Sequence, residues 1–593
     1  MNIINKLSLS HLLESLRIVY HSSKKWTLIN AAVTVVRGIV PLLLLYVVKQ
    51  LIDVVSHQLT GTNIDAQQIY TAIGLTAAFF LLNAISGSVA ALVRERQSHF
   101  VNDYVQNIIH KKTIHLAYQY FEDANFQDTF YRALNDASYR PARVFYNLLQ
   151  TLQSSLTLIL VVLVLTNIHW GMVPLLVISG APIFYYRISY TRKLYRYRRE
   201  HTEDERRVHY FNRLLTAKDF AKELRVFNLG ETFKNEYETF KNELREKQWS
   251  LSKTKTLSEI FVQLFATLIL LFIIGFVVMQ AVKGEISSGS MAMYFLALQR
   301  AYAVLQGLLS GLSSLYEDNL FLKNFFAFRT MARSEEKLQA PFPTPLCDGI
   351  SFDKVSFKYP NTEKWVLKDI SLHIPKGKTI ALVGRNGCGK TTLVKLLCGL
   401  YQPNEGQIKA DQQDWSSISR EALARHISVI FQDFMLYNVS AQDNVRYGNT
   451  RRNKEERFIT EAADKAGIHH LFSDLPQGYN TPLGTLFKGS QMLSRGEWQR
   501  TALARSFYNT DAQLIILDEP TSSLDAFTEA RLIEHFKDIT KDKTAIIVSH
   551  RLSTIKLADI VVVMQDAGIA EIGTPDALMA QKGMYYNMIE SLK

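Results

Sequence analysis

Six long apolar stretches occupy the first half of the chain and constrain its fold more than any other feature. They lie at about residues 26–55, 69–93, 145–166, 171–189, 257–282 and 289–312. A helix needs roughly 20 apolar residues to cross the hydrocarbon core of a bilayer, and each stretch is near or above that length. The sequence therefore predicts an all-α membrane domain of six helices over residues 26–330.

Basic residues are distributed unevenly between the short and the long connections that join the apolar stretches. The short connections are 56–68, 167–170 and 283–288, and the long ones are 94–144 and 192–256. The short ones contain a single basic residue, Lys283, whereas the long ones are rich in Lys and Arg. Because basic residues stay on the cytoplasmic side, the long connections and both chain ends are predicted to be cytoplasmic. Their helical pattern predicts long cytoplasmic extensions of the membrane helices.

The net charge of +12 suits either nucleic acid or an anionic membrane surface. No basic stripe with interleaved aromatic residues appears in the sequence, which favours membrane lipid as the partner and argues against nucleic acid. Residues 1–25 agree with this, because their leucines cluster on one helical face and Lys24 and Lys25 follow them. We interpret this segment as an amphipathic helix along the inner membrane surface.

Two segments inside the long connections mix aromatic with charged residues. They are 120–135 (YFEDANFQDTFYRALN) and 216–228 (TAKDFAKELRVFN). Helices that extend far beyond the bilayer need something to contact. We expect both segments to form short helices that dock on a soluble domain and transmit motion.

A second domain follows Met331, where the composition becomes that of a soluble protein. Residues 331–348 are predicted to be a linker, because 340–347 (APFPTPLC) carries prolines that no helix spans. Residues 349–593 are predicted to form an α/β domain of the P-loop NTPase class.

The first landmark of this domain is IALVGRNGCGKTT at 380–392, an apolar strand that leads into a glycine-rich loop. Its glycines let main-chain N–H groups turn inward around phosphate, Lys390 adds charge at the β and γ oxygens, and Thr391 can hold Mg²⁺. The predicted ATP contacts in this loop are Gly384, Asn386, Gly387, Cys388, Gly389, Lys390, Thr391 and Thr392.

A second landmark is LIILDEP at 514–520, an apolar strand that ends in two carboxylates. Asp518 is placed to organise the magnesium water shell, and Glu519 to orient an attacking water. Together the two motifs predict an enzyme that hydrolyses ATP with Mg²⁺ as cofactor.

The order of further motifs makes the pattern specific. The P-loop is followed by LSRGE at 493–497, LDEPTSSLD at 517–525 and IIVSHR at 546–551. This order resembles the nucleotide-binding domain of an ABC transporter, and the fused six-span half resembles the exporter-type half-transporters of that family, over nearly the whole chain. The resemblance implies ATP-driven export of a peptide, lipid or amphipathic small molecule by alternating access, across the cytoplasmic (inner) membrane of a bacterium.

Carried over motif by motif, the resemblance also implies residue roles. Tyr359 in FKYP stacks on adenine, Gln432 in VIFQD senses magnesium and the attacking water, and His550 contacts the γ-phosphate. The implied catalytic groups are Lys390, Gln432, Glu519 and His550, and the implied metal site is made by Thr391, Gln432 and Asp518.

Three other residues are implied to act across a dimer. Ser494 and Gly496 bind the γ-phosphate of ATP held by the opposite subunit, and Asp525 reaches across the interface. A partner helix beginning near Ser494 would supply N–H donors to the far side of the γ-phosphate. We expect a homodimer, because this chain carries a complete set of hydrolytic groups; a heterodimer with a degenerate partner stays open.

The signature motif departs from the usual LSGGQ of the family at two places. Arg495 and Glu497 stand at its third and fifth positions. One interpretation is a tolerated variant in which the essential serine and second glycine survive. The other is that Arg495 makes an extra contact across the closed dimer and changes turnover.

Two charges lie deep within the apolar stretches. Arg37 is about eleven residues into the first stretch, and Arg300 is a comparable distance into the sixth. Charges inside membrane spans tend to face a cavity or a partner, so both are candidates to line a cavity for cargo that bears carboxylate or phosphate. The alternative is snorkelling or pairing with backbone carbonyls. Import of a small molecule such as a metal chelate is the alternative to export.

Overall fold

The computed structural model describes residues 9–59, 66–123, 126–127, 130, 134, 139–167, 169–330, 340–360, 362–522 and 526–591. The chain divides into two compact units. The first comprises Met1–Leu116 and Ala124–Ala332, and the second comprises Ala117–Asp123 and Arg333–Lys593.

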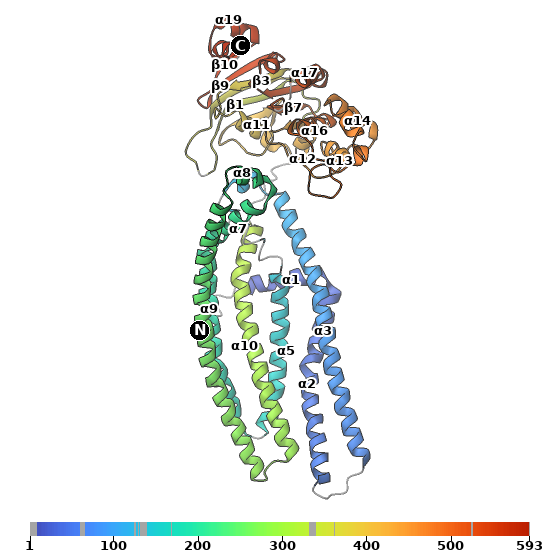
Figure 1. The fold of residues 1–593 in the computed structure, drawn as a ribbon, viewed down its shortest axis with the longest axis vertical. Helices are drawn as coiled ribbons and strands as arrows, with labels where there is room; N and C mark the ends of the chain where they lie inside the picture. The colour runs from blue at the N-terminus through green and yellow to red at the C-terminus, as the bar shows by residue number, and fades with distance from the viewer. Residues whose placement is uncertain are drawn as a thin grey trace. The chain divides into compact units, whose positions relative to one another are not determined.

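The first unit is a bundle of long helices that run alongside one another (Figure 1). The long helices are α2 (Lys24–Leu59), α3 (Ala66–Ile114), α5 (Arg140–Thr166), α6 (Met172–Glu200), α9 (Gly230–Val282) and α10 (Ser288–Thr330). The shorter ones are α1 (Leu9–Ser22), α7 (Thr202–Thr216), η3 (Lys218–Phe220) and α8 (Ala221–Val226). At 1.5 Å per residue α3 and α9 are about 75–80 Å long, far more than the ~30 Å core of a bilayer. The predicted all-α membrane domain with long helical extensions is therefore confirmed.

Five of these helices, α2, α3, α5, α6 and α9, are long and apolar enough to cross a membrane. The sixth predicted span lies in α10, where Gln299, Arg300 and Gln306 interrupt the apolar pattern. This helix packs against α2, α5, α6 and α9, and its Ala297 and Leu298 are fully buried. A helix covered by its neighbours has less surface facing lipid, so it can contain more polar residues than a helix exposed to lipid.

Close helix contacts in the bundle depend on small and polar residues. A Cβ atom at Gly38 of α2 would lie 2.9 Å from Leu156 Cδ2 of α5, so glycine lets these two helices approach. Asn30 of α2 donates a 2.7 Å hydrogen bond to Gln97 of α3, and both side chains are buried. Buried side-chain amides paired in this way fix the register of α2 against α3.

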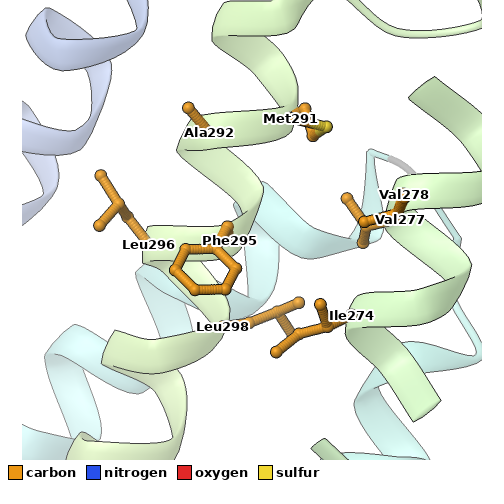
Figure 2. Close-up of a pocket in the computed structure, with 8 residues that line it drawn as sticks. All are labelled: Ile274, Val277, Val278, Met291, Ala292, Phe295, Leu296 and Leu298. Atoms are coloured by element: carbon orange, nitrogen blue, oxygen red, sulfur yellow. The ribbon is translucent and has the colours of Figure 1, made fainter. Parts of the chain in front are cut away.

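An apolar pocket of about 370 Å³ lies between α9 and α10 (Figure 2). All eight lining residues are apolar: Ile274, Val277, Val278, Met291, Ala292, Phe295, Leu296 and Leu298. The pocket can accept hydrocarbon, but its lining side chains contain no group that recognises charge.

A buried ion network joins α5 to α10 in the same unit. Asp318 is fully buried and accepts hydrogen bonds from Arg140 Nη1 at 3.1 Å, from Arg143 Nε at 2.7 Å and from Asn147 Nδ2 at 3.0 Å. Arg143 also reaches Glu317 at 3.0 Å. Removing one partner of such a network leaves an uncompensated buried charge.

We therefore expect Asp318→Ala to destabilise the first unit by about 3–5 kcal/mol, the cost of breaking a buried ion pair. The measurement is the thermal unfolding midpoint of the full chain in lipid nanodiscs. Glu231→Ala is the control, because the Glu231–Lys234 pair is exposed and such pairs contribute little. Equal midpoints for the two variants would contradict a stabilising role for the network.

The second unit is an α/β fold built on two sheets. Its six-stranded sheet has the order β10-β9-β3-β8-β7-β6, in which all neighbours are parallel except β10 and β9. The four-stranded sheet β2-β1-β4-β5 is antiparallel. The strands are β1 (Gly349–Phe357), β2 (Leu367–Pro375), β3 (Thr379–Gly384), β4 (Glu405–Ala410), β5 (Gln413–Asp414), β6 (Ile427–Ile430), β7 (Leu514–Asp518), β8 (Thr544–Val548), β9 (Ile560–Gln565) and β10 (Gly568–Gly573).

Strands β3, β7 and β8 are buried along their whole length, as expected for the centre of a parallel sheet covered on both faces. The helices of this unit are η2 (Tyr118–Glu122), α11 (Lys390–Leu397), η4 (Trp415–Ser417), α12 (Arg420–His426), α13 (Ala441–Arg446), α14 (Glu456–Lys465), α15 (His469–Ser473), η5 (Gly478–Asn480), α16 (Arg495–Tyr508), α17 (Ala526–Thr540), α18 (Leu552–Ile555), α19 (Pro575–Gln581) and α20 (Met584–Glu590). The predicted α/β class is confirmed.

The proline-bearing segment 340–347 belongs to the second unit. Ala340 forms a β-bridge with Ile418, and Phe342 and Leu346 are buried in the core around β1 and β2. The segment is extended, as its prolines require, and it packs against the core of the second unit through these two side chains. The predicted linker residues 331–339 lie outside the described residues.

Candidate functional site

The glycine-rich loop connects β3 to α11. Gly384, Gly387 and Gly389 have φ values of 146°, 81° and 107°, a region that favours glycine. Added Cβ atoms would lie 2.3 Å from Met564 O at Gly384 and 2.8 Å from Val366 O at Gly389, which excludes any side chain there. The loop can therefore bring main-chain N–H groups to the start of α11, where anions bind favourably.

Lys390 is buried at the start of α11. Its ammonium donates hydrogen bonds to the carbonyl oxygens of Gly384 at 2.6 Å and Arg385 at 3.1 Å. The Lys390 side chain thus lies against the glycine-rich loop, in which it is expected to bind phosphate. Of the other predicted loop contacts, Cys388 is buried and Asn386 is exposed.

Two carboxylates end β7 beside this loop. Asp518 is 2% exposed, and its Oδ2 atom has no hydrogen-bond partner among the residues that the structure describes. Burial and the adjacent Glu519 raise the pKa of Asp518 to about 6, although Lys390 and the Thr391 hydroxyl favour its charged form. A buried carboxylate beside a second one is stabilised by a cation.

The side chains around Asp518 fit a magnesium ion. Thr391 is hydrogen-bonded to the Asp518 carboxylate, so a hydroxyl and a carboxylate meet at the start of the P-loop helix. Oxygen ligands of this kind, completed by water and substrate phosphate, are the usual magnesium environment. Gln432, the third predicted ligand, lies beside Glu519, with its Nε2 donating to Oε2 at 2.9 Å.

Glu519 stands at the centre of the predicted catalytic groups. It has a φ of 50°, which turns the chain sharply as it leaves β7, and Gln432 holds one of its oxygens. His550 Nε2 is 4.0 Å from the other oxygen. Burial, together with the Lys390 ammonium, lowers the pKa of His550 although Glu519 opposes this shift, and the neutral imidazole is favoured. The structure brings Lys390, Gln432, Asp518, Glu519 and His550 together from four separate chain segments.

Tyr359 lies at the edge of the same loop. Its hydroxyl is 3.0 Å from Thr392 Oγ1, and its ring makes edge contacts with Phe357 and Tyr401. The Lys395 ammonium is 5.4 Å from the ring centroid. The ring is half-buried, and adenine stacking at Tyr359 stays a prediction.

The signature motif begins a helix. Ser494 is the N-cap of α16, and its Oγ accepts a 3.3 Å hydrogen bond from the Glu497 N–H. The Glu497 carboxylate in turn accepts a 2.7 Å hydrogen bond from the Ser494 N–H, which completes a capping box. Glu497 therefore has a local structural role that its departure from the family pattern did not reveal. Arg495 is exposed, Gly496 lies in the first turn of α16, and Asp525 lies outside the described residues.

A segment from between α3 and α5 is part of the second unit. The Glu122 carboxylate of η2 accepts hydrogen bonds from the Tyr401 hydroxyl and from the Lys395 ammonium, the latter at 3.0 Å. Tyr118 makes an edge contact with Tyr401. The sequence predicted docking for 120–135, and the structure assigns its first residues, up to Asp123, to the second unit. Nothing in the sequence had pointed to Lys395 and Tyr401 as the residues that Glu122 contacts. The other segment predicted to dock, 216–228, lies in the first unit with Val226 and Phe227 exposed, and its docking stays a prediction.

Comparison with known proteins identifies the family. Residues 27–302 match the ABC transporter transmembrane region, and residues 367–522 match the ABC transporter family. The chain is 30% identical to the subtilin transport ATP-binding protein of Bacillus subtilis, over 94% of this chain and 90% of that protein. It is 25% identical to the nisin transport ATP-binding protein of Lactococcus lactis, over 97% and 95%.

The fold is likewise that of a solved structure, a bacterial Atm1-family ABC exporter with ATP bound. The TM-score is 0.81 at 21% identity, and the match covers 97% of this chain and 98% of that one. The chain therefore belongs to the ABC transporter family, as an exporter-type ATPase that carries its membrane region and its ATP-binding region in one polypeptide and couples ATP hydrolysis to transport.

Proposed function

We propose that this chain forms a homodimer that exports a peptide from a bacterial cytoplasm, using ATP with Mg²⁺. The observation that carries the ATPase part is the convergence of Lys390, Gln432, Asp518, Glu519 and His550 at one end of the parallel sheet. The cargo class rests on the two relatives that align over nearly all of this chain, which are named for subtilin and nisin transport. Lipids and amphipathic small molecules are the alternative cargoes.

Hydrolysis follows from the groups around Glu519. The N–H groups of the glycine-rich loop and the Lys390 ammonium bind the phosphates and stabilise charge at the γ-phosphate. Glu519 orients the attacking water and accepts its proton, with Gln432 fixing the carboxylate. Neutral His550 presents a ring nitrogen toward the same place and contacts the γ-phosphate. Positioning and charge stabilisation of this kind account for most catalysis of phosphoryl transfer.

Magnesium would be held by Asp518, Thr391 and Gln432. When bound, it neutralises charge that develops on the β- and γ-phosphates. Asp518 supplies the negative charge that anchors it, and Thr391 orients that carboxylate through their hydrogen bond. The remaining proposed nucleotide contacts are Tyr359, Asn386, Cys388 and Thr392.

Dimerisation follows from the signature helix. The exposed Ser494 and the first turn of α16 offer a hydroxyl, N–H donors and a positive dipole end. We propose that they complete the ATP site of a second copy, together with Gly496 and Asp525. A heterodimer with a different chain is the alternative assembly.

The direction of export rests on the resemblance to exporters, and the placement of basic residues supports the orientation of the chain in the membrane. The positive-inside bias places the ATP-binding unit and both chain ends in the cytoplasm, with the membrane unit in the cytoplasmic (inner) membrane. The η2 segment would carry the effect of ATP to α3 and α5, because it contacts Lys395 on the P-loop helix α11.

The first test replaces the proposed catalytic carboxylate. We expect Glu519→Gln to lower ATP hydrolysis by about 10²–10⁴-fold, since a positioned general base contributes that much, while ATP binding is retained. Hydrolysis and binding are measured on the purified chain in nanodiscs, with the exposed Glu534→Gln as control. A Glu519→Gln rate within a few-fold of wild type would contradict the assignment.

The second test uses the perturbed titration of Asp518. Its raised pKa means that the folded state binds the proton more tightly, so stability falls as pH rises from about 4 to about 6. We expect Asp518→Asn to raise the unfolding midpoint without nucleotide at pH 8, with a smaller gain at pH 5, and yet to abolish Mg²⁺-dependent hydrolysis.

The control for this test is Asp559→Asn, because Asp559 accepts a 2.8 Å hydrogen bond from the Thr379 N–H and pairs with Lys378. It should lower the midpoint. A fall in the midpoint of Asp518→Asn at pH 8 would show that Asp518 is a structural carboxylate.

The third test gives the direction of transport. In inside-out vesicles, ATP added outside should drive accumulation of a fluorescent peptide, and the Glu519→Gln chain should show none. Depletion of peptide from preloaded vesicles would instead establish an importer.

A further inference from the structure

Arg37 of α2 lies within electrostatic range of two arginines on helices that pack against α2. They are Arg94 of α3 and Arg300 of α10, and Arg37 repels each of them. All three are half-buried. The Nε atom of Arg300 is buried and has no hydrogen-bond acceptor among the residues that the structure describes. We call this set the arginine cluster.

Two other arginines of the same unit, by contrast, form ion pairs. Arg140 and Arg143 meet the carboxylates of Glu317 and Asp318. Within the described part of the chain, the arginine cluster forms no ion pair with any carboxylate; Arg94 interacts electrostatically with Arg37 and the Tyr146 phenol, and Arg300 interacts with Arg37. The cluster therefore does not hold its helices together by charge pairing.

Packing against α5 holds the backbone beneath two of these arginines. Gln153 Nε2 donates to Arg37 O at 3.4 Å, and Thr157 Oγ1 donates to Gly38 O at 3.0 Å. The Tyr146 hydroxyl donates to Arg94 O at 2.5 Å. The guanidinium groups are thus kept near one another by helices fixed through other contacts, in spite of their repulsion.

Such an arrangement is costly without a ligand. A charge within the membrane region is expensive, and like charges close together add to the cost. An anion relieves both, and guanidinium groups bind carboxylates with paired N–H donors. Arg94 directly follows the second apolar stretch at its cytoplasmic end, the side from which an exporter takes its cargo. The apolar pocket between α9 and α10 offers no lining group for charge recognition.

We propose that the arginine cluster binds carboxylate groups of the cargo, so that the exported peptide is recognised through an acidic segment. The inference rests on the proposed peptide export and adds Arg94 to the two arginines that the sequence singled out. A lipid phosphate would present similar charge; the peptide is favoured because the proposed cargo is a peptide, and the lipid is an outcome of the test.

The test is peptide binding to the full chain in phosphatidylcholine nanodiscs without ATP, measured by fluorescence anisotropy. Two synthetic peptides differ only in having several glutamates or glutamines at the same positions. The glutamate peptide should bind at least about tenfold more tightly, and added salt should weaken its binding. Arg37→Gln, Arg94→Gln and Arg300→Gln combined should remove this preference.

Two control variants separate charge from fold. Arg96→Gln, two residues from Arg94 on the opposite side of α3, should keep the preference, because Arg96 is exposed and lies over Phe100. The triple Arg→Lys variant should keep part of it. Thermal unfolding midpoints of all variants show whether the triple Gln chain is folded; if it is not, the wild-type comparison of the two peptides decides.

Equal binding of the two peptides to wild type would overturn the proposal. If phosphatidylglycerol in the nanodisc binds through the same arginines and the peptides do not differ, the cluster recognises lipid headgroups and the peptide assignment is wrong. Binding is measured without hydrolysis, so this result stands apart from ATP-driven uptake, whose failure would overturn the proposed function instead.

Discussion

The ATP site depends on two adjacent carboxylates at the end of β7. Parallel pairing with β6 and β8 fixes this strand in the sheet, and full burial of its residues holds Asp518 out of water. A buried carboxylate next to Glu519 favours a cation, and the Lys390 ammonium favours the charged form of Asp518. Strand β3 pairs with the other edge of β8 and leads into the loop that carries this lysine, so one sheet positions both the carboxylates and the ammonium.

One short helix links the phosphate site to the segment between two membrane helices. Lys390 stands at the start of α11, and Lys395 lies on the same eight-residue helix. Lys395 reaches Glu122 of η2, and the neighbouring Tyr401 hydroxyl binds the same carboxylate. A helix this short moves as one piece, so a change of position at the phosphate end also displaces the contact with η2. The same short helix thus contacts both the phosphate loop and η2, which lies between α3 and α5 in the chain.

The phosphate loop and the two carboxylates could be predicted from the sequence because the patterns that mark them are local. The glycines at 384, 387 and 389 require positive φ, and the buried strands before the loop and before Asp518 are continuous apolar runs. The contacts of Glu122 with Lys395 and Tyr401 were not readable, since they join residues more than 270 positions apart. The burial of Phe342 and Leu346 was missed for a related reason: prolines predict an extended chain but do not show what it packs on.

The membrane unit shows the same limit. Composition predicted the spans and the cytoplasmic side, and it flagged Arg37 and Arg300 as deep charges. Arg94 entered the sequence argument only as part of the positive-inside bias. Its place beside Arg37 depends on how α2 packs against α3, through contacts such as that of Asn30 with Gln97. Local patterns thus identified the charged groups, while tertiary packing determines which of them lie near one another.

In the proposed homodimer, one chain holds ATP while Ser494 of the second chain completes the site. The most direct measurement is ATP hydrolysis by a mixture of two inactive variants, Ser494→Ala and Glu519→Gln. A mixed dimer contains one intact site if Ser494 acts on the other chain, so random pairing should restore roughly a quarter of the wild-type rate. A mixture no more active than either variant alone would contradict the account.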